Sequence, residues 1–146
     1  MRPIDSNDIR TVQKAAAGIP QTTAEAIFNI NNGKVLVTGV YGEVTVELGA
    51  GANNAKLTSN PTVGASVDIC ATVDVDTDVV GTMYSTTGTF ANAMIATTSG
   101  ALEAQAGAFV IAAGTLDLDC DASKAGSVKW TIQYIPVDAG ATISAA

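Results

Sequence analysis

Histidine is absent from this 146-residue sequence, and aromatic residues, cysteines and charged residues are all scarce. The absence of histidine removes the usual general base, the Ser-His and Cys-His nucleophile pairs and most transition-metal sites. The serines and threonines have no evident activating partner, so we interpret them as surface and strand hydroxyls. The sequence therefore predicts a chain that is not an enzyme, with no catalytic residue, no cofactor and no metal site.

Only two cysteines occur, Cys70 and Cys120. Strand alternation places Cys120 on the same side as Leu116 and Leu118, and Cys70 on the same side as Thr72. The N-terminal sequence MRPIDSND carries two acids and no apolar stretch follows it, so we expect no secretory signal and synthesis in a reducing cytoplasm. Two buried or half-buried thiols are therefore favoured over a disulfide bridge, and two cysteines without histidine make a poor zinc site.

Charged residues make up 14% of the chain, against about 25% in an ordinary soluble protein. The net charge is −7, and residues 1–18 are slightly basic while the rest is acidic. An acidic body argues against a nucleic-acid partner, because phosphate binding needs a basic face. The longest uncharged run, Val79–Leu102, is broken by Gly, Ser, Thr and Asn, unlike a membrane span. We therefore expect neither a nucleic-acid nor a membrane partner.

Hydrophobic residues reach 47% of the chain, yet aromatics are only 5%, so the apolar content is mainly alanine and valine. A monomer usually stays soluble through a charged surface. This chain instead presents Thr, Ser, Asn, Gly and Ala, which favours a surface that partners cover. The alternative interpretation is a monomer with a neutral surface.

The most informative stretch is Lys34–Leu48, KVLVTGVYGEVTVEL. Before Gly42 the run is apolar on both faces, as in a strand that is covered on both sides, and Gly39 and Gly42 mark places for a bulge or a bend. From Glu43 the sequence alternates strictly, as in a strand with one dry and one wet face. The residues predicted on the dry face are Val44, Val46 and Leu48.

Short runs between Gly, Asn, Ser and Pro predict further strands at 22–30, near 55–58, and at 65–75, 79–85, 92–97, 108–112, 115–121 and 127–137. Asn31-Asn32-Gly33 predicts a type I′ hairpin turn into the stretch that starts at Lys34. In the last strand, Val128, Trp130, Ile132 and Tyr134 are expected to face the core. Residues 19–146 are thus predicted to form one all-β domain, an antiparallel β-sandwich or a barrel-like fold, with 86–107 as an insertion.

Residues 1–18 are predicted to form an N-terminal arm, in which the pattern allows a short helix that Ser6 caps and Gly18 ends. The stripe of Ile9, Val12 and Ala16 is too small to hold such a helix alone in water. We therefore hypothesise that the arm docks on a neighbouring subunit; the alternative is a frayed terminus. The candidate interface residues are Arg2, Ile9, Arg10, Val12 and Lys14.

Two acidic clusters invite comparison with cation sites. Asp74-Val-Asp76-Thr-Asp78 begins like a calcium loop, but Val79 stands where glycine is required and Ser85 where a bidentate glutamate is required. Asp117, Asp119 and Asp121 are expected along the wet face of one strand. A weak cation site there is the alternative to a solvated strand face that discourages edge pairing, and the second interpretation is preferred.

Three stretches carry a resemblance: GIPQTTAEAIFNINNGKVLVTGVYGEVTVEL, then ANNAKLTSNPTVGASVDICATVDV, and finally AAGTLDL with SVKWTIQYIPVDAGATI. Together they resemble a family of small structural proteins of tailed bacteriophages, the capsid decoration or cement proteins. The resemblance covers about residues 18–146 and includes no catalytic motif. The arm lies outside the part that carries it.

The resemblance implies a β-sandwich-like subunit, usually a homotrimer, on the outer surface of the virion capsid. Its partner there is the major capsid protein, whose neighbouring subunits it clamps against the pressure of packaged DNA, after synthesis in the host cytoplasm. A head-fibre base or tail-tube protein is an alternative of the same structural class. A carbohydrate-binding adhesion module is an alternative of another class, but such sites usually use exposed aromatics, and Trp130, Tyr134 and Phe28 are expected to be buried.

Overall fold

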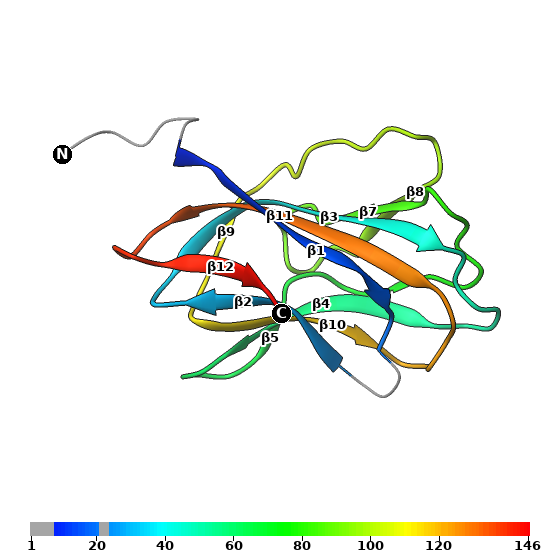
Figure 1. Cartoon of the computed structure of the whole chain (residues 1–146), viewed down its shortest axis with the longest axis horizontal. Helices are drawn as coiled ribbons and strands as arrows, with labels where there is room; N and C mark the ends of the chain where they lie inside the picture. The colour runs from blue at the N-terminus through cyan, green and yellow to red at the C-terminus, as the bar shows by residue number, and fades with distance from the viewer. Residues whose placement is uncertain (1–7, 21–23) are drawn as a thin grey trace.

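The computed structural model describes residues 8–20 and 24–146, and within these ranges the chain forms twelve β-strands and no α-helix (Figure 1). The strands are β1 (Arg10–Gly18), β2 (Ala24–Asn31), β3 (Val35–Val46), β4 (Asn54–Pro61), β5 (Val67–Asp68), β6 (Val73–Asp74), β7 (Met83–Ser85), β8 (Ile95–Thr97), β9 (Phe109–Ile111), β10 (Gly114–Cys120), β11 (Ser127–Pro136) and β12 (Thr142–Ala145).

The strands form two sheets that pack face to face. Sheet A has the order β1-β11-β3-β7-β8, with β9 also paired to β3, and sheet B has the order β12-β2-β10-β4-β5, with β6 also paired to β4. All pairs of these strands are antiparallel. The all-β prediction is confirmed in its sandwich form.

The core lies between the inner faces of the two sheets. As predicted, Trp130, Tyr134 and Phe28 are buried, with exposed fractions of 2%, 3% and 0%. Trp130 stacks on Tyr84 with ring centroids 6.2 Å apart. Leu116 of β10 is fully buried on the opposite sheet. Each such side chain contributes about 1.5–3 kcal/mol by leaving water, so this layer accounts for most of the stabilisation of the sandwich.

Strand β3 alternates between inward and outward side chains as predicted, but only between the two positions where its pairing with β11 is irregular. Its pairing with β11 skips Thr38 and Thr45, so the strand reverses its facing at both positions. Val44 is fully buried, but Val46 is 57% exposed, and the prediction that the two share a dry face is wrong. The part of β3 before Gly42 was predicted to be covered on both faces. Its outer face is only partly covered, because Leu36 and Tyr41 are half-buried.

The chain bends at Asn32-Gly33, but the bend does not close the predicted type I′ hairpin, and the Lys34 amide donates to the Asp138 carboxylate at 2.8 Å. Asn32 and Gly33 take the positive φ values of 65° and 138° that the prediction requires. The two strands that flank the turn nevertheless lie in different sheets, since β2 pairs with β10 and β12 while β3 pairs with β7, β9 and β11. Turn chemistry fixes the local reversal of the backbone, whereas pairing depends on partners far away in the sequence.

Strand β2 contains a bulge that the sequence hides. Its pairing with β10 skips Ile27, so Ile27 and Phe28 are both buried although they are adjacent. Simple alternation along β2 fails before this bulge, because Ala24 is exposed and Ala26 is half-buried.

The strand predicted at 65–75 is two short strands, β5 and β6. Between them the backbone turns inward, so Ile69 and Cys70 are both buried, whereas Val67 is 46% exposed. The Ile69 amide donates to the carbonyl of Leu57 at 3.0 Å, which holds this inward segment against β4. Within 86–107 the predicted short strand is present as β8, and β12 is a strand that the sequence did not predict.

The predicted N-terminal helix is wrong for the part that the structure describes. Residues 10–18 form strand β1, antiparallel to β11 at the edge of sheet A, and Ser6 lies outside the described residues. A helix with three apolar residues has little to stabilise it, whereas the free edge of β11 offers a row of backbone partners. Residues 10–18 are therefore part of the sandwich and not an arm beside it.

Candidate interaction surfaces

Strand β1 places three of the predicted interface residues on one side. Arg10, Val12 and Lys14 stand opposite Tyr134, Ile132 and Trp130 of β11, whose side chains fill the core. They therefore point toward the seam between the edges of the two sheets. Val12 packs against the core, Arg10 is exposed, and the Lys14 ammonium donates a hydrogen bond to the carbonyl of Ala146 beyond β12.

The helical stripe predicted at the N-terminus does not form. The pairing of β1 is irregular between Lys14 and Ala17, so Ala16 lies in a bulge away from Val12. Ile9 precedes the strand and is 39% exposed, and Arg2 lies outside the described residues. A bulge and a lysine are the devices by which natural edge strands avoid pairing with further strands. Docking of these five residues on another subunit stays a prediction.

The outer side of sheet A is almost free of charge. We define face A as the outward side chains of β1, β11, β3 and β9. These include Thr11, Gln13, Ser127, Lys129, Thr131, Gln133, Ile135, Leu36, Tyr41, Glu43, Val46 and Val110. Within this set only Glu43 and Lys129 are charged, and their side chains lie 3.8 Å apart. Ile135, Leu36 and Val110 are cross-strand neighbours and form one apolar row.

Two glycines of β3 let aromatic rings lie flat on the two sides of sheet A. On face A the Tyr41 ring lies over Gly39, where a Cβ would come within 2.6 Å of the hydroxyl. On the inner side the Trp130 ring lies over Gly42, where a Cβ would come within 2.8 Å of the ring. Gly39 and Gly42, which the sequence marked as sites of a bulge or bend, therefore serve close ring packing, and the bulge falls beside the first of them at Thr38.

The outer side of sheet B differs in charge. We define face B as the outward side chains of β2, β10, β4, β5 and β12. These include Ala24, Ala26, Asn29, Asn31, Asn60, Thr115, Asp117, Thr58, Asp68, Lys56, Asp119, Thr142 and Ser144. It therefore presents three carboxylates against one ammonium, together with amides and hydroxyls. Asp117 is only 8% exposed because its neighbours enclose it, with Thr115 donating to one of its oxygens at 2.7 Å.

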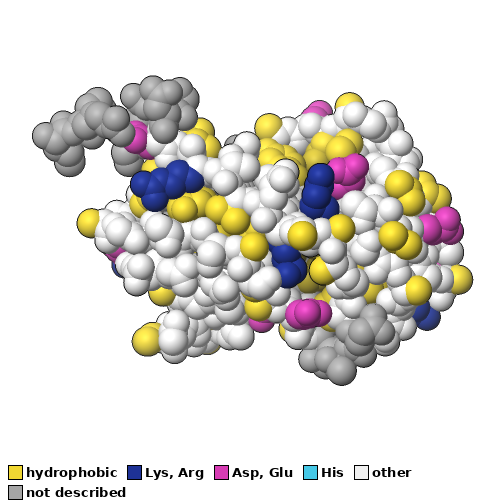
Figure 2. Space-filling model, viewed as in Figure 1, with side chains coloured by type: hydrophobic (Ala, Val, Ile, Leu, Met, Phe, Trp, Pro, Cys, Tyr) yellow, Lys and Arg dark blue, Asp and Glu magenta, His cyan; other side chains and the backbone are white. Residues whose placement is uncertain are grey.

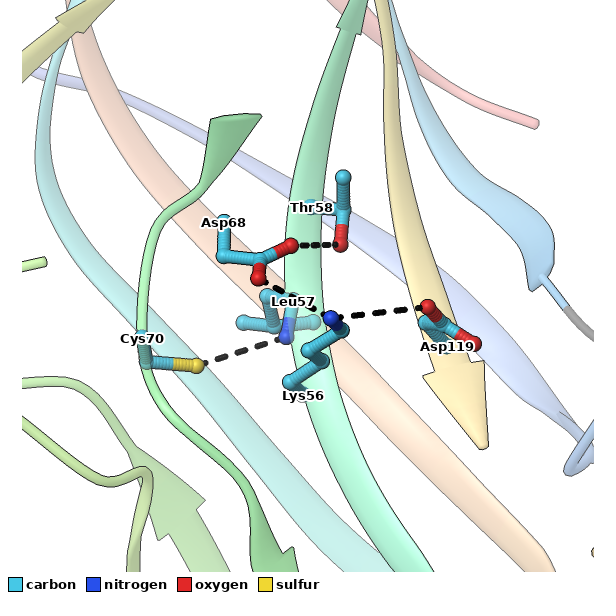
Figure 3. A network of polar contacts seen from close by, with 6 residues as sticks. All are labelled: Lys56, Leu57, Thr58, Asp68, Cys70 and Asp119. Atoms are coloured by element: carbon cyan, nitrogen blue, oxygen red, sulfur yellow. Dashed lines mark hydrogen bonds and ion pairs between the residues drawn. The ribbon is translucent and has the colours of Figure 1, made fainter. Parts of the chain in front are cut away.

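A small ion-pair network joins β10, β4 and the edge strand β5 on face B (Figure 3). The Lys56 ammonium lies 2.9 Å from Asp68 and 3.9 Å from Asp119, and Thr58 donates to the second oxygen of Asp68 at 3.1 Å. The hydrogen bond from Lys56 lowers the pKa of Asp68, and the same bond raises the pKa of Lys56. Exposed pairs of this kind contribute only about 0–1 kcal/mol, so the network organises charge more than it stabilises the fold.

Both cysteines are buried and free, which confirms the preferred expectation. The Cys70 sulfur accepts the amide of Leu57 at 3.3 Å, behind the network of face B (Figure 3). Burial raises the pKa of Cys70 and raises that of Cys120 to about 12. Both thiols are therefore protonated near neutral pH, and a protonated buried thiol is a poor nucleophile.

The carboxylates of the segment that resembles the start of a calcium loop, residues 74–78, accept hydrogen bonds from other parts of the protein. Asp74 accepts the amide of Asn53 at 3.0 Å, and Asp76 accepts the amide of Gly51 at 2.7 Å. Asp78 accepts the hydroxyl of Tyr84, whose pKa is raised by burial and then by this bond. These carboxylates brace neighbouring loops and do not converge on one point.

The aspartates of β10, and Asp121 just beyond its end, are equally dispersed. Asp119 lies beside Lys56, and Asp121 accepts the amide of Asn54 at 2.9 Å, a bond that lowers the pKa of Asp121. Across residues 8–20 and 24–146, no group of three or more His, Cys, Asp or Glu is placed to hold a metal ion. The alternative of a weak cation site at Asp117, Asp119 and Asp121 thus gains no support from the geometry.

The surface view agrees with this account of a chain with few charges. On the side that Figure 1 presents, Figure 2 shows isolated acidic and basic side chains separated by broad uncharged areas with scattered apolar atoms. Large contact surfaces without charge are suited to protein partners, since little polar desolvation opposes their burial.

No family model, no curated protein and no solved structure matches this chain. In the part of the chain that the structure describes, no helix has the length and apolar character to cross a membrane.

Proposed function

We propose that this chain is a structural protein of a tailed-phage virion, a capsid decoration protein that binds the outer capsid and stabilises the head. The resemblance of residues 18–146 to that family names the class. The observation that carries the proposal is face A, a sheet surface on which Glu43 and Lys129 are the only charged members and already pair with each other. A protein that works through shared surface area needs such a face, and it needs no reactive group.

The contrast between the two faces supports this use. Burial of an unpaired carboxylate is costly, whereas hydroxyl, amide and apolar groups are covered at little cost when they find partners. Face A is therefore suited to contact with protein, and face B, with Asp68, Asp117 and Asp119, is suited to water. The major capsid protein and further copies of the chain, in the homotrimer that the resemblance implies, are the proposed partners.

The test compares particles with and without the protein. Purified chain is added to expanded capsids that lack it, and occupancy is measured by electron microscopy together with the temperature at which the particles lose their DNA. The proposal predicts regular added density and a higher release temperature. Capsids that acquire no density and release DNA at the same temperature contradict it, as does a turnover activity that follows the purified chain.

The same images separate the structural alternatives, because a tail-tube protein forms tubes and a fibre-base protein gives sparse, localised density. The carbohydrate-binding alternative gains little from the structure. Phe28, Tyr84, Phe109, Trp130 and Tyr134 are buried. The remaining two aromatics are also engaged, Phe90 edge-on against Phe109 at 5.6 Å and Tyr41 over the backbone of Gly39. Stacking on a sugar ring needs a free aromatic face.

A further inference from the structure

We infer that face A is a self-association surface, on which a second copy of this chain packs through the same face about a two-fold axis. Such pairing concerns the free chain in solution, where no capsid protein covers face A, so it does not depend on the virion proposal. Its grounds are the charge pattern of the face, its extent and its apolar row.

The charge pattern of face A is complementary to itself. Glu43 and Lys129 are cross-strand neighbours of opposite sign, 3.8 Å apart. In a two-fold interface the same patch of both copies makes the contact, so that if residue i of one copy meets residue j of the other, residue j also meets residue i. A two-fold axis near this pair brings each carboxylate toward the other copy's ammonium, and no like charges are forced together.

Face B, the opposite outer face of the sandwich, does not offer this to a second copy. The chain carries a net charge of −7, so two copies repel each other unless they meet through a neutral surface. On face B the carboxylates of Asp68, Asp117 and Asp119 outnumber the single Lys56, and pairing of that face with itself sets like charges opposite one another.

The extent of face A reaches what a stable pair needs. Strands β1, β11, β3 and β9 span nine, ten, twelve and three residues. At about 3.3 Å per residue and about 4.8 Å between strands they cover on the order of 540 Å² per copy. A pair therefore covers about 1,100 Å², just above the roughly 1,000 Å² that a specific interface should clear.

The composition of face A also resembles an interface. The row of Ile135, Leu36 and Val110 supplies apolar contact, and Val110 is 49% exposed. Threonine and glutamine side chains surround this row and can exchange hydrogen bonds across the contact. An apolar centre with a polar, uncharged surround is the usual anatomy of a protein–protein contact.

The first test is the mass of the full chain in solution, measured by light scattering and sedimentation equilibrium. The expected mass is two chains, or six chains where the homotrimer of the virion proposal also pairs through face A, and a mass of three chains overturns the inference. Thr131→Glu places a carboxylate in the middle of face A, so we expect the mass to fall by half. Thr142→Glu is the matched control, because Thr142 lies outward on face B beside the buried Ile143. The control is expected to keep the wild-type mass, and the fluorescence of buried Trp130 reports that each variant is folded.

Charge reversal tests the pairing itself. Glu43→Lys or Lys129→Glu alone gives two like charges on each copy, and each is expected to weaken association about tenfold or more. The double variant Glu43→Lys/Lys129→Glu restores opposite signs and is expected to return within about threefold of wild type.

A monomeric wild-type chain overturns the inference, as does an assembly that keeps its mass with Thr131→Glu or that dissociates equally with Thr142→Glu. A double reversal that stays as weak as the single variants also overturns it. Failure of the virion proposal is a separate result, because it shows as wild-type chain that adds nothing to capsids, whatever its mass in solution.

Discussion

The two outer faces of this sandwich share one folding pattern and differ in chemistry. Both belong to antiparallel strands whose inner side chains, such as Trp130 on sheet A and Leu116 on sheet B, fill the same core. Outward, face A has one balanced ion pair and an apolar row, whereas face B has three carboxylates around Lys56. The inner positions are dictated by folding, so the outer positions are where the chain can adapt each side to its surroundings.

The difference concerns the cost of removing water. When face B is covered, carboxylates such as Asp119 lose their water. The single Lys56 ammonium, which Asp119 shares with Asp68, offsets only part of that desolvation cost. Covering face A removes hydroxyls, amides and methyl groups from water, and these find partners on another protein. One side of the sandwich is therefore suited to contact and the other to exposure.

The largest expected effect comes from the core that supports both faces. Trp130→Ala removes a ring that stacks on Tyr84 and lies over Gly42, so we expect the free energy of unfolding to fall by about 3–5 kcal/mol. Chemical denaturation measures this. Tyr41→Ala on face A is the matched aromatic truncation, and a loss as large as that of Trp130→Ala would contradict the assignment of Tyr41 to the outer surface.

The next effect compares the two sides of sheet A at its glycines. Gly42→Ala drives a Cβ to 2.8 Å from the Trp130 ring, which has no room to move, and we expect a loss of about 1–3 kcal/mol in the free energy of unfolding. Gly39→Ala meets the end of the half-buried Tyr41 ring, which can rotate into solvent, so the expected loss is smaller. Urea denaturation measures both losses. Equal losses in the free energy of unfolding would contradict the placement of Tyr41 on the outer side and Trp130 on the inner side of sheet A.

The smallest expected effect concerns the ion pair of face B. The pKa of Asp68 is lowered by Lys56, so the stabilisation from this pair is fully present above the unfolded Asp pKa of 3.8 and is lost as the pH falls through the lower folded value. Lys56→Met is therefore expected to cost about 0.2–1 kcal/mol in the free energy of unfolding near pH 7. Denaturation at a series of pH values should show this difference shrinking in acid. A difference that grows in acid would contradict the pair.

Much of the inner pattern can be predicted from the sequence, since strand alternation identifies Trp130, Ile132 and Tyr134 as inward residues of β11. What alternation misses are single skipped residues. The bulges at Ile27 and Thr45 reverse the facing of everything beyond them, and nothing in the local sequence announces them. Alternation is a local property, whereas a bulge is a property of two paired strands.

The sequence also does not predict which strands pair with each other. The Asn32-Gly33 turn has the chemistry of a hairpin, yet its two strands lie in different sheets. Residues 10–18 have a weak apolar pattern, and only the free edge of β11 makes them a strand. For the same reason the sequence predicts Lys129, Thr131 and Gln133 as outward residues of β11 but not face A as a whole, because that face exists only once β1 and β3 lie beside β11 and β9 lies beside β3.

The central claim, that face A is covered by protein and face B by water, is tested most directly by a matched pair of isosteric substitutions. Gln133→Glu and Asn29→Asp each add one negative charge without a change of shape, the first on face A and the second on face B. The measurement is the association constant of the full chain by sedimentation equilibrium. The account predicts weaker association for Gln133→Glu and an unchanged constant for Asn29→Asp; equal constants for the two variants, or a loss confined to Asn29→Asp, would contradict it.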